Sequence, residues 1–275
     1  MSPILSPQYD RPQNWQEALD LLQASGRSVL LQRGPHPDPI YTRDADRLID
    51  LCLLDLDYIE FHPGSRLAIG AQTSLQSIAQ SPLLQQYANG LLAEAAYASA
   101  ALGLRNAAVL GGALAESDGP PELVLALLAA GAEVILRTAM EVGHTLTLDN
   151  YLATRRAGDR TGILVEVLLP AGETYGALQR VARTPHDQAI VAAAAVADSS
   201  GRLRLALSSW SQERLLLEAA PPGRTPEALA GLANQARQSC RPQGDYRGSA
   251  EYRSEMAAVL ARRAAAAAWQ AQSGA

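Results

Sequence analysis

The stretch that decides the fold is LRNAAVLGGALAESDGPPELVLALL, residues 104–128. An apolar run ends there in the pair Gly111-Gly112, and after a polar break residues 122–130 show the apolar pattern of a helix. Paired glycines let a backbone approach a ligand closely and present successive N–H groups to an anion, because no Cβ blocks the way. The same pattern is also typical of a tight turn before a helix, so the glycines alone leave both interpretations open.

Composition indicates a globular protein without a polyanionic partner. With 275 residues, of which 48% are hydrophobic, the chain can bury a substantial core, which we expect to divide into two or three subdomains. Arg supplies all 23 of the Lys and Arg residues, and the formal net charge is −5. No block of basic residues stands out, which argues against a nucleic-acid or anionic-membrane partner.

The two cysteines, Cys52 and Cys240, lie far apart in the sequence and form no C-x-x-C pair. No His cluster lies near either, so we expect no metal or iron–sulfur site built by this chain alone. Cys52 lies in an apolar run and is predicted to be a buried free thiol. The N-terminus lacks the pattern of a signal peptide, and the longest apolar run has the length of a strand. We therefore expect a soluble, cytoplasmic protein without a membrane span.

Helices and strands are predicted to alternate in the first 170 residues. Asn14 is placed to cap a helix, with Glu17 at the capping-box position. Pro63-Gly64-Ser65 has the composition of the turn in a hairpin over residues 57–71, and Thr73 is expected to begin the next helix. Helices are predicted over residues 15–24, 91–101, 122–130 and 149–154, and strands over residues 28–32, 48–53, 133–139 and 162–169.

A boundary is predicted at Pro170-Ala171-Gly172, beyond which the pattern changes. Gly201 has the place of a hairpin turn, and Thr225 with Pro226 is typical of a helix start. Strands are expected over residues 176–182, 189–197, 203–210 and 214–219, followed by helices over residues 225–238 and 249–270. A sheet followed by helices is an α+β arrangement.

Several segments resemble one protein family. Residues 105–115 read RNAAVLGGALA and resemble the signature R-N-x-x-T-x-G-G-N-L-A of the flavin-binding (medium) subunits of molybdenum hydroxylases, the carbon monoxide dehydrogenase and xanthine dehydrogenase family. Residues 65–78 are similar to that family's R-L-x-I-G-A-x-T-x-L-x-x-I segment. Residues 179–191, QRVARTPHDQAIV, are similar to its K-x-x-R-R-x-x-D-x-A-x-V segment. Residues 245–264 are close to D-x-R-x-S-A-x-Y-R-x-x-x-x-x-V-L-x-R-R-A. The resemblance covers essentially the whole chain.

The resemblance implies a fold, a cofactor and partners. The fold would be α+β: a vanillyl-alcohol-oxidase-type FAD-binding domain at residues 1–170, with subdomains at about 1–55 and 56–170. A small C-terminal domain of a sheet plus helices, at residues 173–275, would follow. The cofactor would be FAD. Such subunits pass electrons from an iron–sulfur small subunit to an external acceptor, while a separate large subunit holds the molybdopterin.

The resemblance also implies which residues hold the cofactor. In the second of two pyrophosphate loops, Leu110, Gly111, Gly112 and Ala113 align with the family's x-G-G-N segment. Val109 and Ala113 replace its Thr and Asn and so remove two side-chain donors. Two charged residues complete the implied set: Glu122 aligns with an Asp that binds the cofactor's sugar, and Arg180 with a Lys near the flavin ring.

The first pyrophosphate loop aligns with residues 32–37 and departs further from the family. Arg33 replaces a glycine beside Gly34, His36 follows, and Pro35 and Pro37 offer no N–H. The loss of two or three charge-assisted hydrogen bonds, at about 1.5–3 kcal/mol each, would weaken FAD binding by several orders of magnitude. Arg33 could pair directly with the phosphates or be a solvated loop side chain, and both interpretations stay open.

Two functional hypotheses follow. The first is a flavin-type electron-transfer subunit of a molybdenum hydroxylase-like oxidoreductase, with FAD bound weakly or absent. The second is a non-flavin structural or assembly subunit that kept the fold and lost FAD. The sequence contains no G-x-S-x-G elbow, H-E-x-x-H pair or Walker loop that would favour another enzyme class. The residues of the first loop are the feature that separates the two hypotheses.

Overall fold

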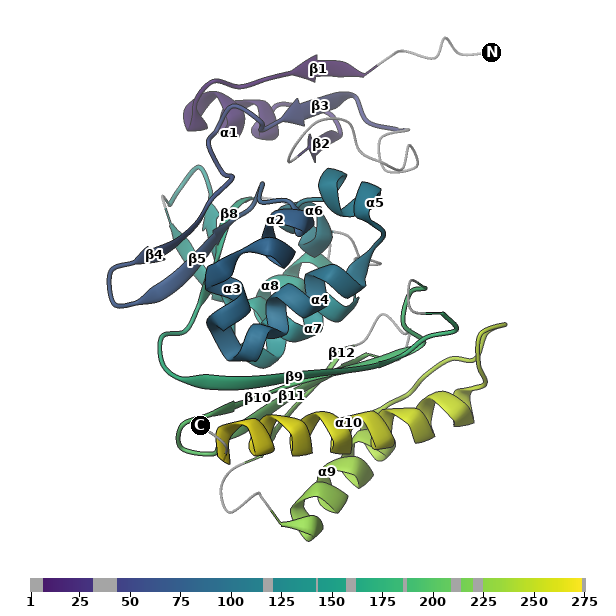
Figure 1. The fold of residues 1–275 in the computed structure, drawn as a ribbon. Helices are drawn as coiled ribbons and strands as arrows, with labels where there is room; N and C mark the ends of the chain where they lie inside the picture. The colour runs from purple at the N-terminus through teal and green to yellow at the C-terminus, as the bar shows by residue number, and fades with distance from the viewer. Residues whose placement is uncertain are drawn as a thin grey trace.

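The computed structural model describes residues 7–31, 44–115, 121–141, 143–156, 162–184, 187–208, 214–219 and 225–273. Its strands form three sheets, each with its own helices, and the α+β prediction is confirmed. Figure 1 shows the N-terminal sheet at one end of the molecule, a five-stranded sheet with most of the helices in the middle, and a four-stranded sheet at the other end.

The N-terminal sheet has three parallel strands in the order β1-β3-β2. The strands are β1 (Gln8–Asp10), β2 (Ser28–Leu31) and β3 (Arg47–Asp50), and helix α1 (Trp15–Gln23) precedes β2. The predicted cap is confirmed: Asn14 Oδ1 accepts the Glu17 N–H at 3.0 Å, and the Glu17 carboxylate accepts the Gln13 N–H at 2.8 Å. Residue 32, the end of the strand predicted over residues 28–32, lies outside the described residues.

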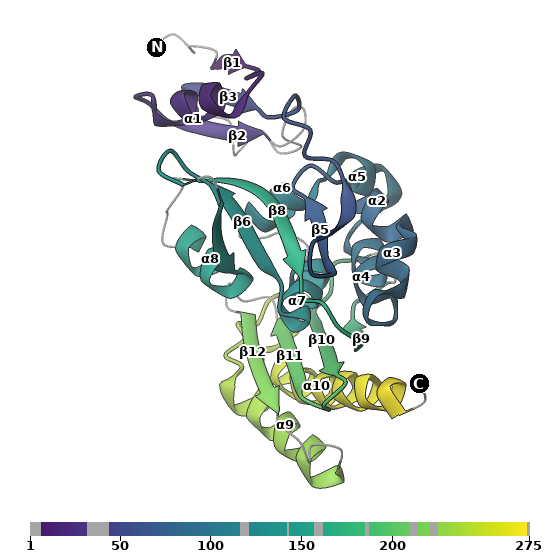
Figure 2. The ribbon, with the colours of Figure 1, turned by 90° about the vertical axis from the view of Figure 1, so that its left-hand side faces the viewer.

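The middle sheet is antiparallel, in the order β4-β5-β8-β6-β7. Its strands are β4 (Ile59–His62), β5 (Arg66–Gly70), β6 (Glu133–Arg137), β7 (His144–Thr147) and β8 (Ile163–Leu169). Figure 2 shows β6, β8 and β5 side by side above the four-stranded sheet. The predicted β4–β5 hairpin is confirmed, with Gly64 and Ser65 at φ +83° and +61° in its turn.

Short helices connect the strands of the middle sheet. They are α2 (Leu75–Gln80), α3 (Pro82–Gln86), the 3₁₀ helix η2 (Tyr87–Gly90), α4 (Leu91–Ser99), α5 (Leu102–Ala107), α6 (Leu110–Ala115), α7 (Pro121–Ala130) and α8 (Leu148–Arg156). The N-cap of the helix after β5 lies one residue later than predicted. Ser74 is its N-cap and accepts the Ser77 N–H, whereas the Thr73 hydroxyl donates to the Tyr58 carbonyl.

The last sheet is antiparallel in the order β12-β11-β10-β9 and is followed by two helices. The elements are β9 (Thr174–Val181), β10 (Val191–Asp198), β11 (Leu203–Ser208), β12 (Arg214–Ala219), α9 (Pro226–Ser239) and α10 (Ala250–Ser273). Gly201 turns the β10–β11 hairpin with φ +86°, and Thr225 caps α9 by accepting the Ala228 N–H, both as predicted. Residues 209 and 210, the predicted end of the third strand, lie outside the described residues.

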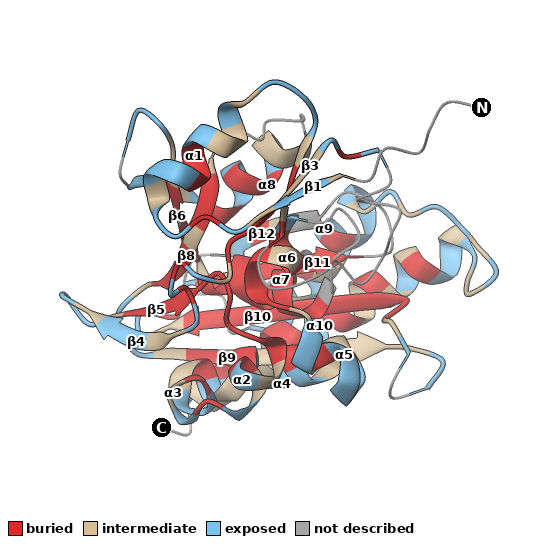
Figure 3. Ribbon diagram, turned by 90° about the horizontal axis from the view of Figure 1, so that it is seen from above, coloured by how far each residue is buried: buried red, intermediate tan, exposed pale blue. Residues whose placement is uncertain are grey.

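Strand β10 is buried on both faces. Ala192, Ala194 and Val196 belong to the core cluster that contains α7, whereas Ala193 and Ala195 belong to the cluster that contains α10. Successive side chains of a strand point to opposite faces, so β10 is clamped between α7 and α10. Figure 3 shows β10 and α7 coloured as buried. Because Ala side chains extend only a short way from the sheet, the two helices can pack closely on its two faces.

The structure corrects one sequence-based prediction and tests two others. Cys52 is partly exposed rather than buried, because it lies just beyond β3, where its N–H donates to the Asp50 carboxylate. The described residues include no group of three or more His, Cys, Asp or Glu side chains that could hold a metal ion. In the same part of the chain, every helix is too short or too polar to span a bilayer.

Enlarging the α10-facing side of β10 tests the clamp. Ala193→Leu is expected to lower the free energy of unfolding by about 1–3 kcal/mol, because three added carbon atoms have no space between β10 and α10. Urea denaturation followed by circular dichroism measures the loss, and Ala171→Leu at an exposed position is the control. An unfolding midpoint of Ala193→Leu equal to that of the control would show that α10 does not pack tightly on β10.

Candidate functional site

The glycine pair does not form a tight turn. Gly111 and Gly112 lie in the first turn of α6, and the backbone of neither is in the left-handed region. Before them, Val109 forms an isolated antiparallel bridge with Ser74, next to the segment that joins β5 to α2. The glycines are thus the start of a helix whose N-terminal N–H groups face the β5–α2 segment.

Several N–H groups at the start of α6 donate hydrogen bonds to carbonyl groups of this chain. The Leu110 N–H donates to the Thr73 carbonyl at 2.9 Å, and the Gly111 N–H donates to the Ala71 carbonyl at 2.7 Å. The Ala113 N–H donates to Val109 at 3.0 Å. Those three N–H groups hold α6 in place, so Gly111 does not offer its donor to a ligand.

Gly112 differs from its neighbours. Within the described part of the chain, its N–H meets no acceptor. A Cβ built on Gly112 would contact only the Val109 Cγ2 atom, at the ordinary distance of 3.8 Å. Neither the packing of the described residues nor the backbone angles therefore require glycine at this position. An unengaged N–H beside a missing Cβ is the arrangement that close approach of a phosphate needs.

The charged residues predicted for the site contact each other. Glu122, in the first turn of α7, is 1% exposed, and its Oε1 lies 3.0 Å from Nε of Arg180 on β9. The Arg180 guanidinium also donates to the Asp187 carbonyl. Burial raises the pKa of Glu122, while its own N–H, Arg180 and the Ala189 N–H act in the opposite direction. The pair ties the start of α7 to the edge strand of the last sheet.

Sequence reasoning missed two backbone contacts of this pair. The Asp187 carbonyl accepts from Arg180, and the Ala189 N–H interacts with the Glu122 carboxylate. The available signal was the R-x-x-x-D-x-A segment at residues 183–189, in which Asp187 and Ala189 are the Asp and the Ala. Their contacts come from the main chain, so residue types alone could not have assigned them.

Arg105, the first residue of the glycine signature, is a further buried charge that sequence reasoning did not assign. It is 7% exposed, its Nη1 donates to the carbonyls of Tyr97 and Ala100 at 3.1 and 2.6 Å, and its Nε donates to Gln76 at 2.8 Å. A cation at the C-terminal end of α4 satisfies carbonyls that the helix leaves unpaired. Arg105 thus holds α5 against the end of α4, just before the glycine segment.

The segment predicted to be the first pyrophosphate loop, residues 32–37, lies outside the described residues, and with it Arg33, Gly34 and His36. Of the predicted site, the structure therefore brings together Glu122 and Arg180, and it places Leu110, Gly111, Gly112 and Ala113 on α6. Leu110 and Ala113 are buried and contribute packing rather than polar side-chain contacts.

Removing the cation of the buried pair is expected to destabilise the fold in a pH-dependent manner. Arg180→Leu should cost about 3–5 kcal/mol, because it leaves the Glu122 carboxylate buried without its partner. Loss of Arg180 raises the folded-state pKa of Glu122 further above its unfolded-state pKa. The free energy of unfolding therefore falls as pH rises from the unfolded-state pKa to the folded-state pKa. The cost is therefore larger at about pH 8 than at about pH 5. Urea denaturation at both pH values measures it.

The double variant Glu122→Leu/Arg180→Leu is the control for this prediction. Removal of both charges leaves no uncompensated carboxylate, so its cost should be smaller than that of Arg180→Leu and independent of pH. If Arg180→Leu lowered the free energy of unfolding by the same amount at both pH values, the ionisation of Glu122 would not depend on Arg180.

Comparison with known proteins gives a consistent result. A family described as the FAD binding domain in molybdopterin dehydrogenase matches residues 5–172. The carbon monoxide dehydrogenase medium chain of Hydrogenophaga pseudoflava is 28% identical, over 95% of this chain and 96% of its own length. The glyceraldehyde dehydrogenase medium chain of Sulfolobus acidocaldarius is 23% identical, over 93% and 96%.

A solved structure shows the same similarity. It is carbon monoxide dehydrogenase from Hydrogenophaga pseudoflava, in a form that lacks the Mo-pyranopterin moiety of the molybdenum cofactor. One of its chains matches with a TM-score of 0.86 and 29% identity, over 97% of this chain and 98% of that one. Since the FAD-binding family also matches more than half of the sequence, this chain belongs to the family of FAD-binding medium subunits of molybdenum hydroxylases.

Proposed function

We propose that this chain is the flavin-type electron-transfer subunit of a molybdenum hydroxylase-like oxidoreductase. The observation that carries the proposal is Gly112, whose N–H is unengaged in the described structure and whose missing Cβ leaves room at the start of α6. This position lies within the region that matches the FAD-binding family. Bound FAD would supply an isoalloxazine ring that accepts and releases electrons, whereas the protein supplies binding and orientation.

Different residues of the proposed site would contact different parts of FAD. The Gly112 N–H would donate to the pyrophosphate at the N-terminus of α6, beside the packing surface of Leu110 and Ala113. Glu122 would accept from a hydroxyl of the sugar, and Arg180 fixes the orientation of that carboxylate. Arg180 would also place positive charge near the flavin ring. Arg33, Gly34 and His36 would form the other side of the pyrophosphate site.

We infer that the isolated chain binds FAD weakly. Val109 and Ala113 lack the side-chain donors of the family signature, and Pro35 and Pro37 lack backbone donors. The alternative, a structural or assembly subunit that lost FAD, has one observation in its favour. Both charges of the Glu122–Arg180 pair are satisfied within the protein, so this part of the fold does not depend on a ligand.

Membership of the family supports a proposal about the partner subunits. The two relatives named above are medium chains, and we propose that this chain likewise joins an iron–sulfur small subunit and a molybdopterin-bearing large subunit. The medium chains of two enzymes named for different substrates, carbon monoxide and glyceraldehyde, are both similar to this chain. The large subunit, rather than this chain, would therefore determine the substrate. Residues 1–170 would form the FAD-binding domain, divided near residue 55, and residues 173–275 a separate C-terminal domain.

A single glycine substitution separates a ligand role from a folding role. Gly112→Ala is expected to stabilise the protein by about 0.5–1 kcal/mol, because Ala favours the helix and its Cβ meets no close atom. The same Cβ should obstruct the pyrophosphate and lower FAD affinity by about tenfold or more. Thermal unfolding and titration followed by flavin fluorescence measure the two effects.

Gly103→Ala is the matched control, since Gly103 also lies in a short helix, α5, with no atom near the position of a Cβ. It should give the stabilisation without the loss of affinity. Gly112→Ala protein that binds FAD as tightly as wild type would contradict the proposed pyrophosphate site.

Rebuilding the missing donors tests why binding is weak. The substitutions Arg33→Gly, Pro35→Thr, His36→Asp, Val109→Thr and Ala113→Asn together return backbone freedom, backbone donors and side-chain donors. The affinity for FAD should rise by about a hundredfold, which corresponds to about 2.7 kcal/mol. Wild-type protein should leave gel filtration with its flavin absorbance far below full occupancy. A tightly bound wild type, or a folded variant of unchanged affinity, would refute this explanation.

A further inference from the structure

Residues 187–190 lie between β9 and β10 and are in contact with the Glu122–Arg180 pair. The Asp187 carbonyl accepts from Arg180, and the Ala189 N–H interacts with the Glu122 carboxylate. The Ile190 N–H donates to the Val181 carbonyl at 2.7 Å, which closes the segment onto the end of β9. The position of this segment therefore sets two of the contacts that orient the pair.

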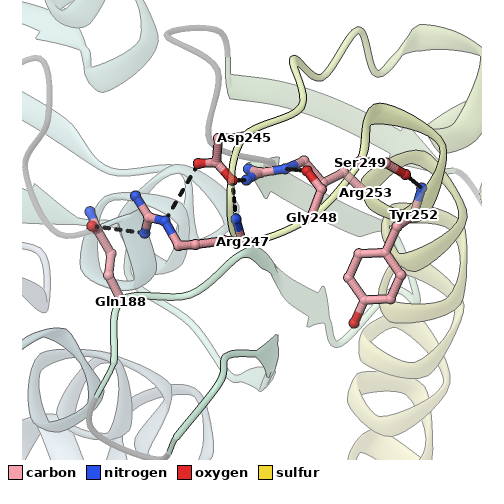
Figure 4. A network of polar contacts seen from close by, with 7 residues as sticks. All are labelled: Gln188, Asp245, Arg247, Gly248, Ser249, Tyr252 and Arg253. Carbon is pink, nitrogen blue, oxygen red and sulfur yellow. Dashed lines mark hydrogen bonds and ion pairs between the residues drawn. The ribbon is translucent and has the colours of Figure 1, made fainter.

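The same segment also contacts the turn at residues 245–248, just before α10. Arg247 Nη1 lies 3.5 Å from the Gln188 side-chain oxygen. A Cβ on Gly248 would be 3.7 Å from Ile190 Cγ2 and 3.0 Å from the Tyr252 ring, so the turn lies close to the segment. Figure 4 shows Arg247 directed toward Gln188, with Asp245 between Arg247 and Arg253.

Charged groups hold the turn in place. Arg253, which is fully buried on α10, donates to the Asp245 carboxylate and to the Gly248 carbonyl. Asp245 also accepts the Arg247 N–H at 2.7 Å, and its other oxygen lies 3.5 Å from Arg247 Nε. The Arg247 side chain is 14% exposed, so its contacts are less weakened by solvent than those of surface ion pairs.

We propose that Arg247 is a positioning residue of the candidate flavin site. It acts through Gln188 on residues 187–190, which in turn orient the Glu122–Arg180 pair. The contacts form a continuous path from the start of α10 to the start of α7. This inference rests on the proposed function, because the pair is assigned to FAD there. It adds that Arg247, in the turn before α10, contributes to the site without touching the cofactor.

The test uses the full chain and two single variants, Arg247→Gln and Gln188→Leu. Each is expected to weaken FAD binding by about tenfold and to speed amide hydrogen exchange at residues 187–190. The double variant should be no worse than Arg247→Gln, because both changes break one path. Arg237→Gln is the control: its ion pair with Glu255, at 3.1 Å, joins α9 to α10 away from the path. It should change neither quantity.

Three outcomes would overturn the proposal. In the first, Arg247→Gln speeds exchange in α10 but not at residues 187–190, so the residue merely anchors the helix. In the second, exchange at residues 187–190 rises while FAD affinity stays unchanged. In the third, the effects of the two single variants on affinity add fully. A wild type that takes up no FAD refutes the proposed function instead; exchange at residues 187–190 then decides whether Arg247 positions the pair.

Discussion

The clamping of β10 between α7 and α10 is the constraint on which the rest of the structure depends. Its alanines let one helix pack on each face, and this fixes α7 relative to the last sheet. Arg180 on β9 pairs in register with Ala192, which belongs to the α7-facing side of β10. Cross-strand partners share a face of the sheet, so Arg180 points toward α7 and meets Glu122 in its first turn. The packing of small apolar side chains thus places the two charges of the candidate site.

Stability alone does not explain why those charges are there. A buried ion pair loses hydration on both partners, and apolar residues of similar volume are often as stable. Burial raises the pKa of Glu122 despite Arg180, which shows that the desolvation of this carboxylate is not fully offset. In the proposed flavin site both charges would have a role, since Glu122 would accept from a hydroxyl group of the sugar and Arg180 would place positive charge near the flavin ring. In this account the Asp187 carbonyl and Ala189 N–H hold the pair ready before a ligand arrives.

Much of the fold could be predicted from the sequence, because its longer elements have clear apolar patterns and caps. Helices α1, α7 and α9 were predicted within one or two residues, as was the β4–β5 hairpin. Elements such as α5 and α6 were missed because six residues are too few to show a helical period. The site residues were proposed from a family signature, but their contacts could not be. The Glu122–Arg180 pair joins positions 58 apart, and the Gly111 N–H is engaged by the carbonyl of Ala71. Both follow from tertiary packing, which local sequence does not encode.

The two glycines of α6 therefore have different meanings. Gly111 and Leu110 donate to carbonyls of the β5–α2 segment, so they hold the helix start in place whether or not a ligand is present. A preformed helix start lowers the cost of ordering the site, and weak binding would then come from missing donors rather than from a collapsed loop. A chain that lost FAD would still need Gly111 and Leu110 to fasten α6. The described fold gives Gly112 no such task, because neither its backbone angles nor its neighbours require a glycine. Gly112 thus separates the two hypotheses. Bound FAD would require a glycine at this position, whereas a subunit without FAD would not.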